Sequence, residues 1–233
     1  MTESAEPIQM REWPALAAEG AGGGDMSVRC FVALGDSFSA GTEQGVEPFP
    51  DRVASLLPGS RYLNLACDGA RSADVEAGQL EPALAAAPDL VSVVCGANDV
   101  VATTRPAIDE FGASFERILT ALGDRRVVTA TYPAVAELLA LRPRTRERMS
   151  AGLDAVNAHI RRLSERHGAT CLDLAGHEPN ADPANFADDG FHPSALGHRR
   201  AAEAFGAVLR DRLGIELDGG APGKISPHPA TTA

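Results

Sequence analysis

Five short apolar runs alternate with longer helical stretches, and this alternation limits the folds that the chain can adopt. The apolar runs are rich in Val, Leu and Cys, which is typical of strands that are covered on both faces of a sheet. The predicted strands span residues 29–34, 61–66, 89–95, 126–131 and 169–174. The predicted helices span about 48–57, 73–87, 107–122, 145–167 and 194–213.

Repeated βα units of this kind predict a parallel sheet whose strands are joined by right-handed crossovers. We therefore expect an α/β protein with three layers (α/β/α), in which a flavodoxin-like five-stranded parallel sheet of order 2-1-3-4-5 carries helices on both faces. In open sheets of this kind, ligands bind beyond the carboxyl ends of the strands, at the point where the strand order reverses. Strands 1 and 3 would flank that point, so the residues that follow them are candidates for a functional site.

The length of 233 residues and the hydrophobic content of 44% indicate one domain with a sizeable core. We place this domain at residues 29–215. Residues 1–28 are predicted to be a flexible N-terminal extension, in which Met26 is an alternative start. Residues 216–233 are predicted to be a flexible C-terminal tail, because Gly, Pro, Thr and Ala dominate there.

The charge and the cysteines exclude several classes of partner. The net charge of −11 argues against nucleic acid or an anionic membrane, since both need a basic surface. The four cysteines have neither CxxC nor zinc-ligand spacing, so buried reduced thiols are expected. The N-terminus lacks the basic and apolar regions of a secretory signal, and no run approaches the ~18 apolar residues of a membrane helix. We therefore expect a cytoplasmic protein without stable membrane insertion.

The chain offers too few grouped acidic residues and histidines to predict a metal, and no cofactor is expected.

Ser37 follows the first predicted strand in the tight turn Gly35-Asp36-Ser37. Such a strand-to-helix turn can expose a hydroxyl, and a nearby helix N-terminus favours developing negative charge. Serine is a poor nucleophile unless a neighbouring base takes its proton. An ordinary turn serine is the alternative interpretation, and the GxSxG pattern of many lipases is absent.

His192 is the candidate base for Ser37, and Asp189 lies three residues before it. Asp189 would accept a hydrogen bond from the imidazole and hold its tautomer, as in a Ser-His-Asp arrangement. Asp188 is the second choice for this role. His177, beside Glu178, is a weaker alternative base.

Gly69 and Asn98 follow the second and third predicted strands. The side-chain amide of Asn98 and the backbone N–H groups of Gly69 and Ser37 are candidate donors to an oxyanion. Both residues also fit ordinary turn chemistry. Asp36 and Asp99 are interpreted as carboxylates that brace these loops.

Together these segments resemble the SGNH hydrolases, also called GDSL-type esterases and lipases, over about residues 29–213. The matching blocks are Gly35-Asp36-Ser37, Gly69, Gly96-Ala97-Asn98-Asp99 and Asp189-Gly190-Phe191-His192. Phe38 stands where the name-giving pattern has leucine, and we expect this difference to affect packing rather than mechanism.

The resemblance implies roles for the candidate residues. Ser37 would be the nucleophile, His192 the base and Asp189 its orienting partner. The oxyanion hole would consist of the N–H groups of Ser37 and Gly69 and the side chain of Asn98. The family needs no cofactor, which agrees with the absence of a predicted metal site.

The expected function is hydrolysis of a small-molecule acyl ester with a small or medium acyl chain, through an acyl-enzyme. Acyl transfer or thioester hydrolysis at the same site is the alternative, and an inactive flavodoxin-like binding module is less favoured. Loops 38–50, 99–108 and 132–148 are predicted to shape the pocket. In the third loop, the apolar run 132–141 is a candidate acyl pocket wall. Three arginines follow it: Arg142, Arg144 and Arg146. They are expected either to bind an anionic leaving group or to form the solvated basic end of a short amphipathic helix.

Overall fold

The computed structural model describes residues 27–42, 45–102, 105–176 and 182–218. Most of the predicted N-terminal extension, including Met26, and most of the predicted tail lie outside the described residues. The domain limits at residues 29 and 215 therefore stay predictions.

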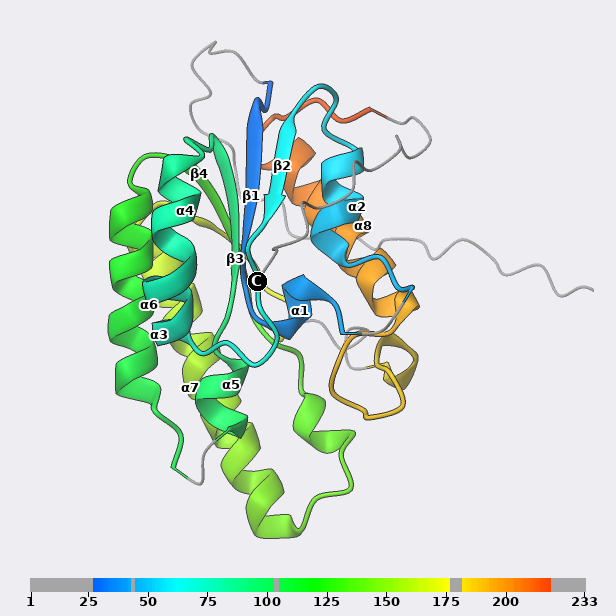
Figure 1. The fold of residues 1–233 in the computed structure, drawn as a ribbon. Helices are drawn as coiled ribbons and strands as arrows, with labels where there is room; N and C mark the ends of the chain where they lie inside the picture. The colour runs from blue at the N-terminus through cyan, green and yellow to red at the C-terminus, as the bar shows by residue number, and fades with distance from the viewer. Residues whose placement is uncertain (1–26, 43–44, 103–104, 177–181, 219–233) are drawn as a thin grey trace, which may run out of the picture.

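The centre of the fold is a five-stranded parallel sheet of order β2-β1-β3-β4-β5 (Figure 1). The strands are β1 (Cys30–Gly35), β2 (Arg61–Asn64), β3 (Leu90–Val94), β4 (Arg126–Ala130) and β5 (Thr170–Leu172). The predicted strand order is confirmed, and each strand lies within its predicted range or extends one residue beyond it. The sheet therefore reverses its order between β1 and β3, where the candidate residues follow the strand ends.

Helices cover both faces of the sheet, as predicted. One face carries α3 (Ser72–Asp74), α4 (Leu80–Ala85), α5 (Ala97–Val101), α6 (Ile108–Leu122) and α7 (Pro143–Arg166). The other carries α1 (Ser37–Ala40), α2 (Phe49–Ser55) and α8 (Ala195–Asp211), as Figure 1 shows.

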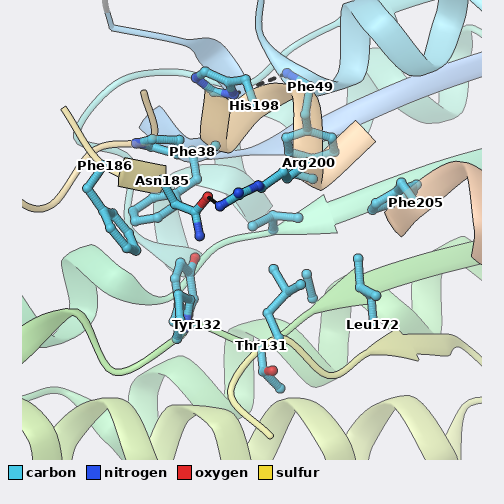
Figure 2. Close-up of a pocket in the computed structure, with 17 residues that line it drawn as sticks. Phe38, Phe49, Thr131, Tyr132, Leu172, Asn185, Phe186, His198, Arg200 and Phe205 are labelled. Carbon is cyan, nitrogen blue, oxygen red and sulfur yellow. Dashed lines mark hydrogen bonds between the residues drawn. The ribbon is translucent and has the colours of Figure 1, made fainter. Parts of the chain in front are cut away.

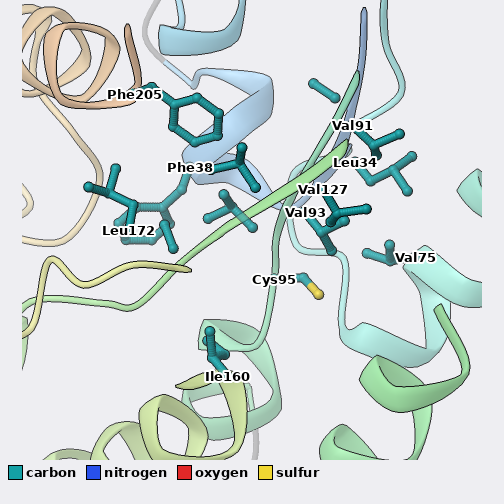
Figure 3. Packing of buried hydrophobic residues seen from close by; sticks show 14 of the residues in the cluster. Leu34, Phe38, Val75, Val91, Val93, Cys95, Val127, Ile160, Leu172 and Phe205 are labelled. Carbon is teal, nitrogen blue, oxygen red and sulfur yellow. The ribbon is translucent and has the colours of Figure 1, made fainter. Parts of the chain in front are cut away.

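The core lies on both sides of the central strands. β1 and β3 are buried along their whole length, because each has a strand on either side and helices above and below. Figure 3 shows Phe205 of α8 on one side of the strands and Ile160 of α7 on the other. Ile160 belongs to the apolar stripe that recurs at helical spacing along α7, and every member of the stripe is buried; the members are Leu153, Val156, Ile160 and Leu163.

The helix predicted over residues 73–87 is interrupted by a π-helical turn at Val75–Gln79. Pro82 stands just beyond this turn and has no N–H group, so the regular hydrogen bond to the carbonyl of Gly78 cannot form. The wider turn is closed instead by the N–H of Leu80, which donates to the carbonyl of Val75. Gln79, the last residue of this turn, reaches Gly35 at the end of β1, so the turn adjoins the site.

Candidate active site

The turn that carries Ser37 is fixed by close contacts at the end of β1. Gly35 has φ +152, and a Cβ atom there would lie 2.1 Å from the carbonyl oxygen of Val94 on β3. Only glycine lets the two strands approach so closely at this point. The amide of Gln79 also binds both backbone groups of Gly35: its Oε1 accepts the N–H at 2.8 Å and its Nε2 donates to the carbonyl at 2.9 Å. Ser37 is therefore held at a rigid position, as the first residue of α1.

Ser37, His192 and Asp189 form a hydrogen-bonded relay. His192 Nε2 lies 3.1 Å from Ser37 Oγ, and His192 Nδ1 lies 2.6 Å from Asp189 Oδ2. A carboxylate accepts only, so the Nδ1 proton lies toward Asp189 and Nε2 is left to accept the serine proton. The Ser37 residue is 2% exposed, whereas the Asp189 side chain is 51% exposed. The relay thus joins a buried hydroxyl to a carboxylate at the surface.

Asp189 shapes the loop of residues 182–194, here called the His192 loop. Its second oxygen, Oδ1, accepts the backbone N–H groups of Phe191 at 2.8 Å and His192 at 2.9 Å. Partial burial opposes the negative charge, but the hydrogen bonds from the His192 ring and from these N–H groups outweigh it. They hold the pKa of Asp189 below its ordinary value. Asp189, rather than Asp188, contacts His192 within the described residues, and the alternative pair at 177 and 178 lies outside them.

Asn98 follows β3 and bonds the loop that carries Gly69 after β2. Asn98 Nδ2 donates to the carbonyl oxygen of Ala70 at 3.0 Å, which orients the amide and leaves its second hydrogen for another acceptor. Gly69 is exposed and has φ +75, a conformation that favours glycine. Asp99 fastens the two loops together, because its carboxylate accepts both the N–H and the hydroxyl of Ser72, at 3.0 and 2.7 Å. Ser37, Gly69 and Asn98 thus follow strand ends at one edge of the sheet, and the hydrogen bonds of His192 join Asp189 to Ser37 there.

Residues 33–200 match the sequence model of the GDSL-like Lipase/Acylhydrolase family. The chain belongs to this family. It is a carboxylic ester hydrolase of the GDSL type, so the resemblance noted from the motif blocks is confirmed.

Individual relatives support this assignment. A lipase from Streptomyces rimosus is 28% identical, over 80% of this chain and 90% of the relative. Lipase 1 from Streptomyces coelicolor is 30% identical, over 82% of this chain and 74% of the relative.

Solved structures share the fold of this GDSL hydrolase. The extracellular lipase of Streptomyces rimosus superposes with a TM-score of 0.64 at 24% identity, covering 77% of this chain and 99% of the other. A catalytic mutant of an acetylxylan esterase from Geobacillus stearothermophilus gives a TM-score of 0.66 at 22% identity, covering 82% and 96%.

Tyr132 is a site residue of the hydrolase that the motif blocks did not indicate. Its hydroxyl donates to Asp36 Oδ2 at 3.0 Å, while Asp36 Oδ1 accepts the N–H of Phe38 at 3.0 Å. Asp36 is completely buried. Burial raises the pKa of Asp36 to about 7, although the two hydrogen bonds act in the opposite direction. The signal that could have identified Tyr132 is its position just after β4, at the same edge of the sheet as the other candidates.

A pocket of about 210 Å³ opens beside the His192 loop. Its wall is largely apolar and is formed by Val100, Val101, Leu139, Leu141, Thr145, Arg148, Met149 and Phe191. The predicted loops 99–108 and 132–148 both contribute to this wall, whereas the described residues of loop 38–50 do not. Phe191 precedes His192 directly, so the pocket adjoins the relay.

The segment that contains the apolar run and its arginines does not form the separate short amphipathic helix considered above. Residues 135–137 form a single 3₁₀ turn, and Arg144 and Arg146 belong to the first turns of α7. Arg146 Nη2 lies 3.4 Å from the carbonyl oxygens of both Leu139 and Leu141, to which it donates. Arg146 therefore braces the pocket wall.

A second cavity of about 90 Å³ lies behind the relay, between α8 and the ends of β4 and β5. Figure 2 shows Thr131, Tyr132 and Leu172 along one side of it and His198, Arg200 and Phe205 along the other. His198 is buried and accepts the N–H of Phe49 on Nδ1 at 3.2 Å. Burial lowers the pKa of His198 to about 4, so this histidine is neutral and structural.

Within the described ranges, no three His, Cys, Asp or Glu side chains are grouped so that they could bind a metal ion. The same ranges contain no helix of the length and apolar character needed to cross a bilayer.

Proposed function

We propose that this GDSL hydrolase cleaves carboxylic acyl esters through the triad Ser37, His192 and Asp189 and through an acyl-enzyme intermediate. The observation that carries the proposal is the continuous relay from Ser37 Oγ to His192 at 3.1 Å and from His192 to Asp189 at 2.6 Å. A nucleophile, a base and a base-orienting carboxylate within hydrogen-bond reach are the parts that this chemistry needs.

In the first step, Ser37 Oγ attacks the ester carbonyl while His192 Nε2 takes the serine proton. The imidazolium ion that forms is stabilised by the Asp189 carboxylate. His192 then gives the proton to the departing alcohol, which leaves the acyl group on Ser37. In the second step His192 takes a proton from a water molecule, which attacks the acyl carbonyl; the bond to Ser37 Oγ then breaks, His192 returns the proton to Ser37, and the acid leaves.

The developing oxyanion would accept hydrogen bonds from three groups at the edge of the sheet: the N–H groups of Ser37 and Gly69 and the side-chain amide of Asn98. Ser37 N–H lies at the start of α1, where a backbone N–H has no acceptor within the helix. Asn98 Nδ2 keeps a hydrogen to donate after its bond to Ala70. Donors that are already oriented stabilise charge at no cost in reorganisation, which favours the transition state over the ground state.

A serine-directed fluorophosphonate probe tests this chemistry directly. The native protein should be labelled stoichiometrically, with the adduct on Ser37 in the peptide map, because only a base-activated serine reacts readily. Protein unfolded before labelling is the control and should react little. Labelling on another serine, or no labelling of folded protein, would contradict the triad.

The acyl chain is proposed to be short or medium in length and to lie in the pocket beside Phe191. The pocket of about 210 Å³ is lined mainly by apolar side chains, which suits an acyl chain rather than a polar group. Val101 forms part of the wall and is 37% exposed, so its side chain is open to a ligand in the pocket. Exposed apolar surface beside a catalytic relay is suited to covering an acyl chain.

Variants at Val101 test the chain-length proposal. Across chromogenic esters from acetyl to dodecanoyl, the wild-type kcat/KM should be highest between butanoyl and octanoyl. Val101→Trp should move the optimum to shorter chains by narrowing the pocket, and Val101→Ala should move it to longer ones. A wild-type preference for dodecanoyl esters, or an optimum that neither substitution moves, would contradict the proposed pocket.

A cytoplasmic location remains part of the proposal. The supporting observation is that all four cysteines are free thiols, which suits a reducing compartment. Activity recovered from the culture medium instead of the cell lysate of the native host would contradict it.

A further inference from the structure

Tyr132 is fixed from several sides. It follows β4 and is 2% exposed. The side-chain amide of Asn157 on α7 binds both its backbone groups: Oδ1 accepts the N–H at 2.8 Å and Nδ2 donates to the carbonyl at 2.9 Å. The ring of Tyr132 packs edge-on against Phe38, with ring centroids 5.1 Å apart. A hydroxyl held by so many contacts points in one direction only.

That hydroxyl points at Asp36, the residue before Ser37. The bond joins residues 96 positions apart in the sequence and crosses from the end of β4 to the end of β1. The two oxygens of Asp36 are divided between Tyr132 and the N–H of Phe38, so the carboxylate connects β4 with the turn that carries the nucleophile. The chain of contacts Asn157–Tyr132–Asp36 therefore positions Ser37 from α7.

Asp36 also carries a buried charge close to the relay. It faces Tyr132 after β4, Cys95 after β3, Asp99 on α5 and His192. Burial raises the pKa of the Cys95 thiol well above its ordinary value, which keeps the thiol neutral. Asp99 repels a charge on Asp36, whereas a positive His192 attracts it. An anionic Asp36 would therefore favour the imidazolium ion that His192 becomes during the reaction.

We propose that Tyr132 is a positioning residue of the hydrolase, whose hydroxyl holds the Asp36 carboxylate as an anion beneath Ser37 and His192. This inference rests on the proposed roles of Ser37 and His192. The tyrosine hydroxyl bonds Asp36 and neither Ser37 nor His192, so it acts through Asp36.

The pH dependence follows from the state of Asp36. Because burial raises its pKa to about 7, the carboxylate takes up a proton as the pH falls through neutrality. The attraction for the imidazolium ion is then lost, so activity should fall on the acid side. Removing the Tyr132 hydroxyl takes a donor away from the anion, which raises the pKa of Asp36 further and moves the acid limb to higher pH.

The test is Tyr132→Phe. This variant keeps the aromatic ring and the two hydrogen bonds from the Asn157 side chain to the backbone of residue 132, and it removes only the hydroxyl. We expect kcat to fall about tenfold, with KM changed by less than about twofold. The acid limb of the pH profile should move up by about one unit. In an Asp36→Asn background, Tyr132→Phe should leave the profile where it was, since no carboxylate remains to titrate.

Tyr62→Phe is the matched control. The chain has two tyrosines. Tyr62 lies on β2, away from the relay, and its hydroxyl also donates to a carboxylate, that of Asp51, at 2.6 Å. This variant should keep the wild-type rate and profile. Equal effects from the two tyrosine variants, or a Tyr132→Phe enzyme with the wild-type profile, would overturn the inference.

If thermal denaturation shows that Tyr132→Phe folds poorly, Asp36→Asn alone decides. It keeps one of the two acceptor oxygens and removes the charge, so the acid limb should flatten or move to lower pH. An unchanged limb would overturn the inference. Labelling of Ser37 in the wild-type protein is a separate result, so failure of the positioning role can be told apart from failure of the proposed function.

Discussion

Replacing Ser37 by alanine should lower kcat/KM by about 10⁴-fold or more, because no other described hydroxyl lies within reach of His192 Nε2. The residual rate would come from the oxyanion donors and from substrate binding, which the substitution leaves in place. The loss of one oxygen should not disturb the fold, since Asp36, rather than Ser37, supplies the N-terminal hydrogen bond of α1. Initial rates on a butanoyl ester, together with thermal denaturation of the purified variant, measure both effects.

Ser39→Ala is the matched control for this variant. Ser39 lies two residues further along α1 and is also buried, but its hydroxyl has no hydrogen-bond partner among the described residues. A buried hydroxyl without a partner costs free energy, so this variant should keep full activity and unfold at the same or a higher temperature. If Ser37→Ala turned over the ester at a rate near that of Ser39→Ala, the triad mechanism would be wrong.

Replacing Asn98 by alanine should lower kcat by about 10²- to 10³-fold while KM changes little. The amide is proposed to donate to the oxyanion, which carries its full charge only in the transition state, so the loss falls on the chemical step. Its orientation depends on the bond to Ala70 at 3.0 Å, and its burial to 9% exposure keeps water from competing. Steady-state kinetics on one ester, with kcat and KM determined separately, measure this effect.

Asn98→Ala also removes a brace between two loops, so the control must remove a brace without removing the oxyanion donor. Asn64→Ala does this. Asn64 Nδ2 donates to the carbonyl of Ser39 at 3.0 Å, and its Oδ1 accepts the N–H of Ala66 at 3.1 Å. A small effect at Asn64 beside a large one at Asn98 would support the oxyanion role. Similar losses at both positions would attribute the effect to loop structure instead.

The secondary structure was most predictable where burial is complete. β1 and β3 are covered on both faces, so their sequences are continuous apolar runs with clear ends. The helix predicted over 73–87 is present, but its π-helical turn was not predicted; Gln79 at the end of that turn contacts Gly35. That contact joins residues 44 positions apart, and a local pattern carries no information about it. The short helices α1 and α5 were missed because four or five residues show no helical period.

The candidate residues were found because the strand ends of a parallel sheet gather at one edge. Ser37, Gly69 and Asn98 each follow a predicted strand, and motif spacing then singled out His192 and Asp189. The sequence left Asp188 open as a partner for His192. The loop geometry distinguishes the two carboxylates, since Asp189 bonds both the ring and the backbone of His192.

The sequence by itself determined the fold class and the family of this protein, because apolar runs, helical periods and short motif blocks are local patterns. The strand order was predicted by analogy with flavodoxin-like sheets, and the structure confirms it. Only the tertiary structure decided that the Tyr132 hydroxyl bonds Asp36, and that the side chains of Asn157 and Gln79 bond the backbone of distant residues. It also decided which loops form the pocket beside Phe191. These features depend on contacts between segments far apart in the chain. A hydrogen bond forms or fails within a few tenths of an ångström, and only the packed structure sets distances that finely.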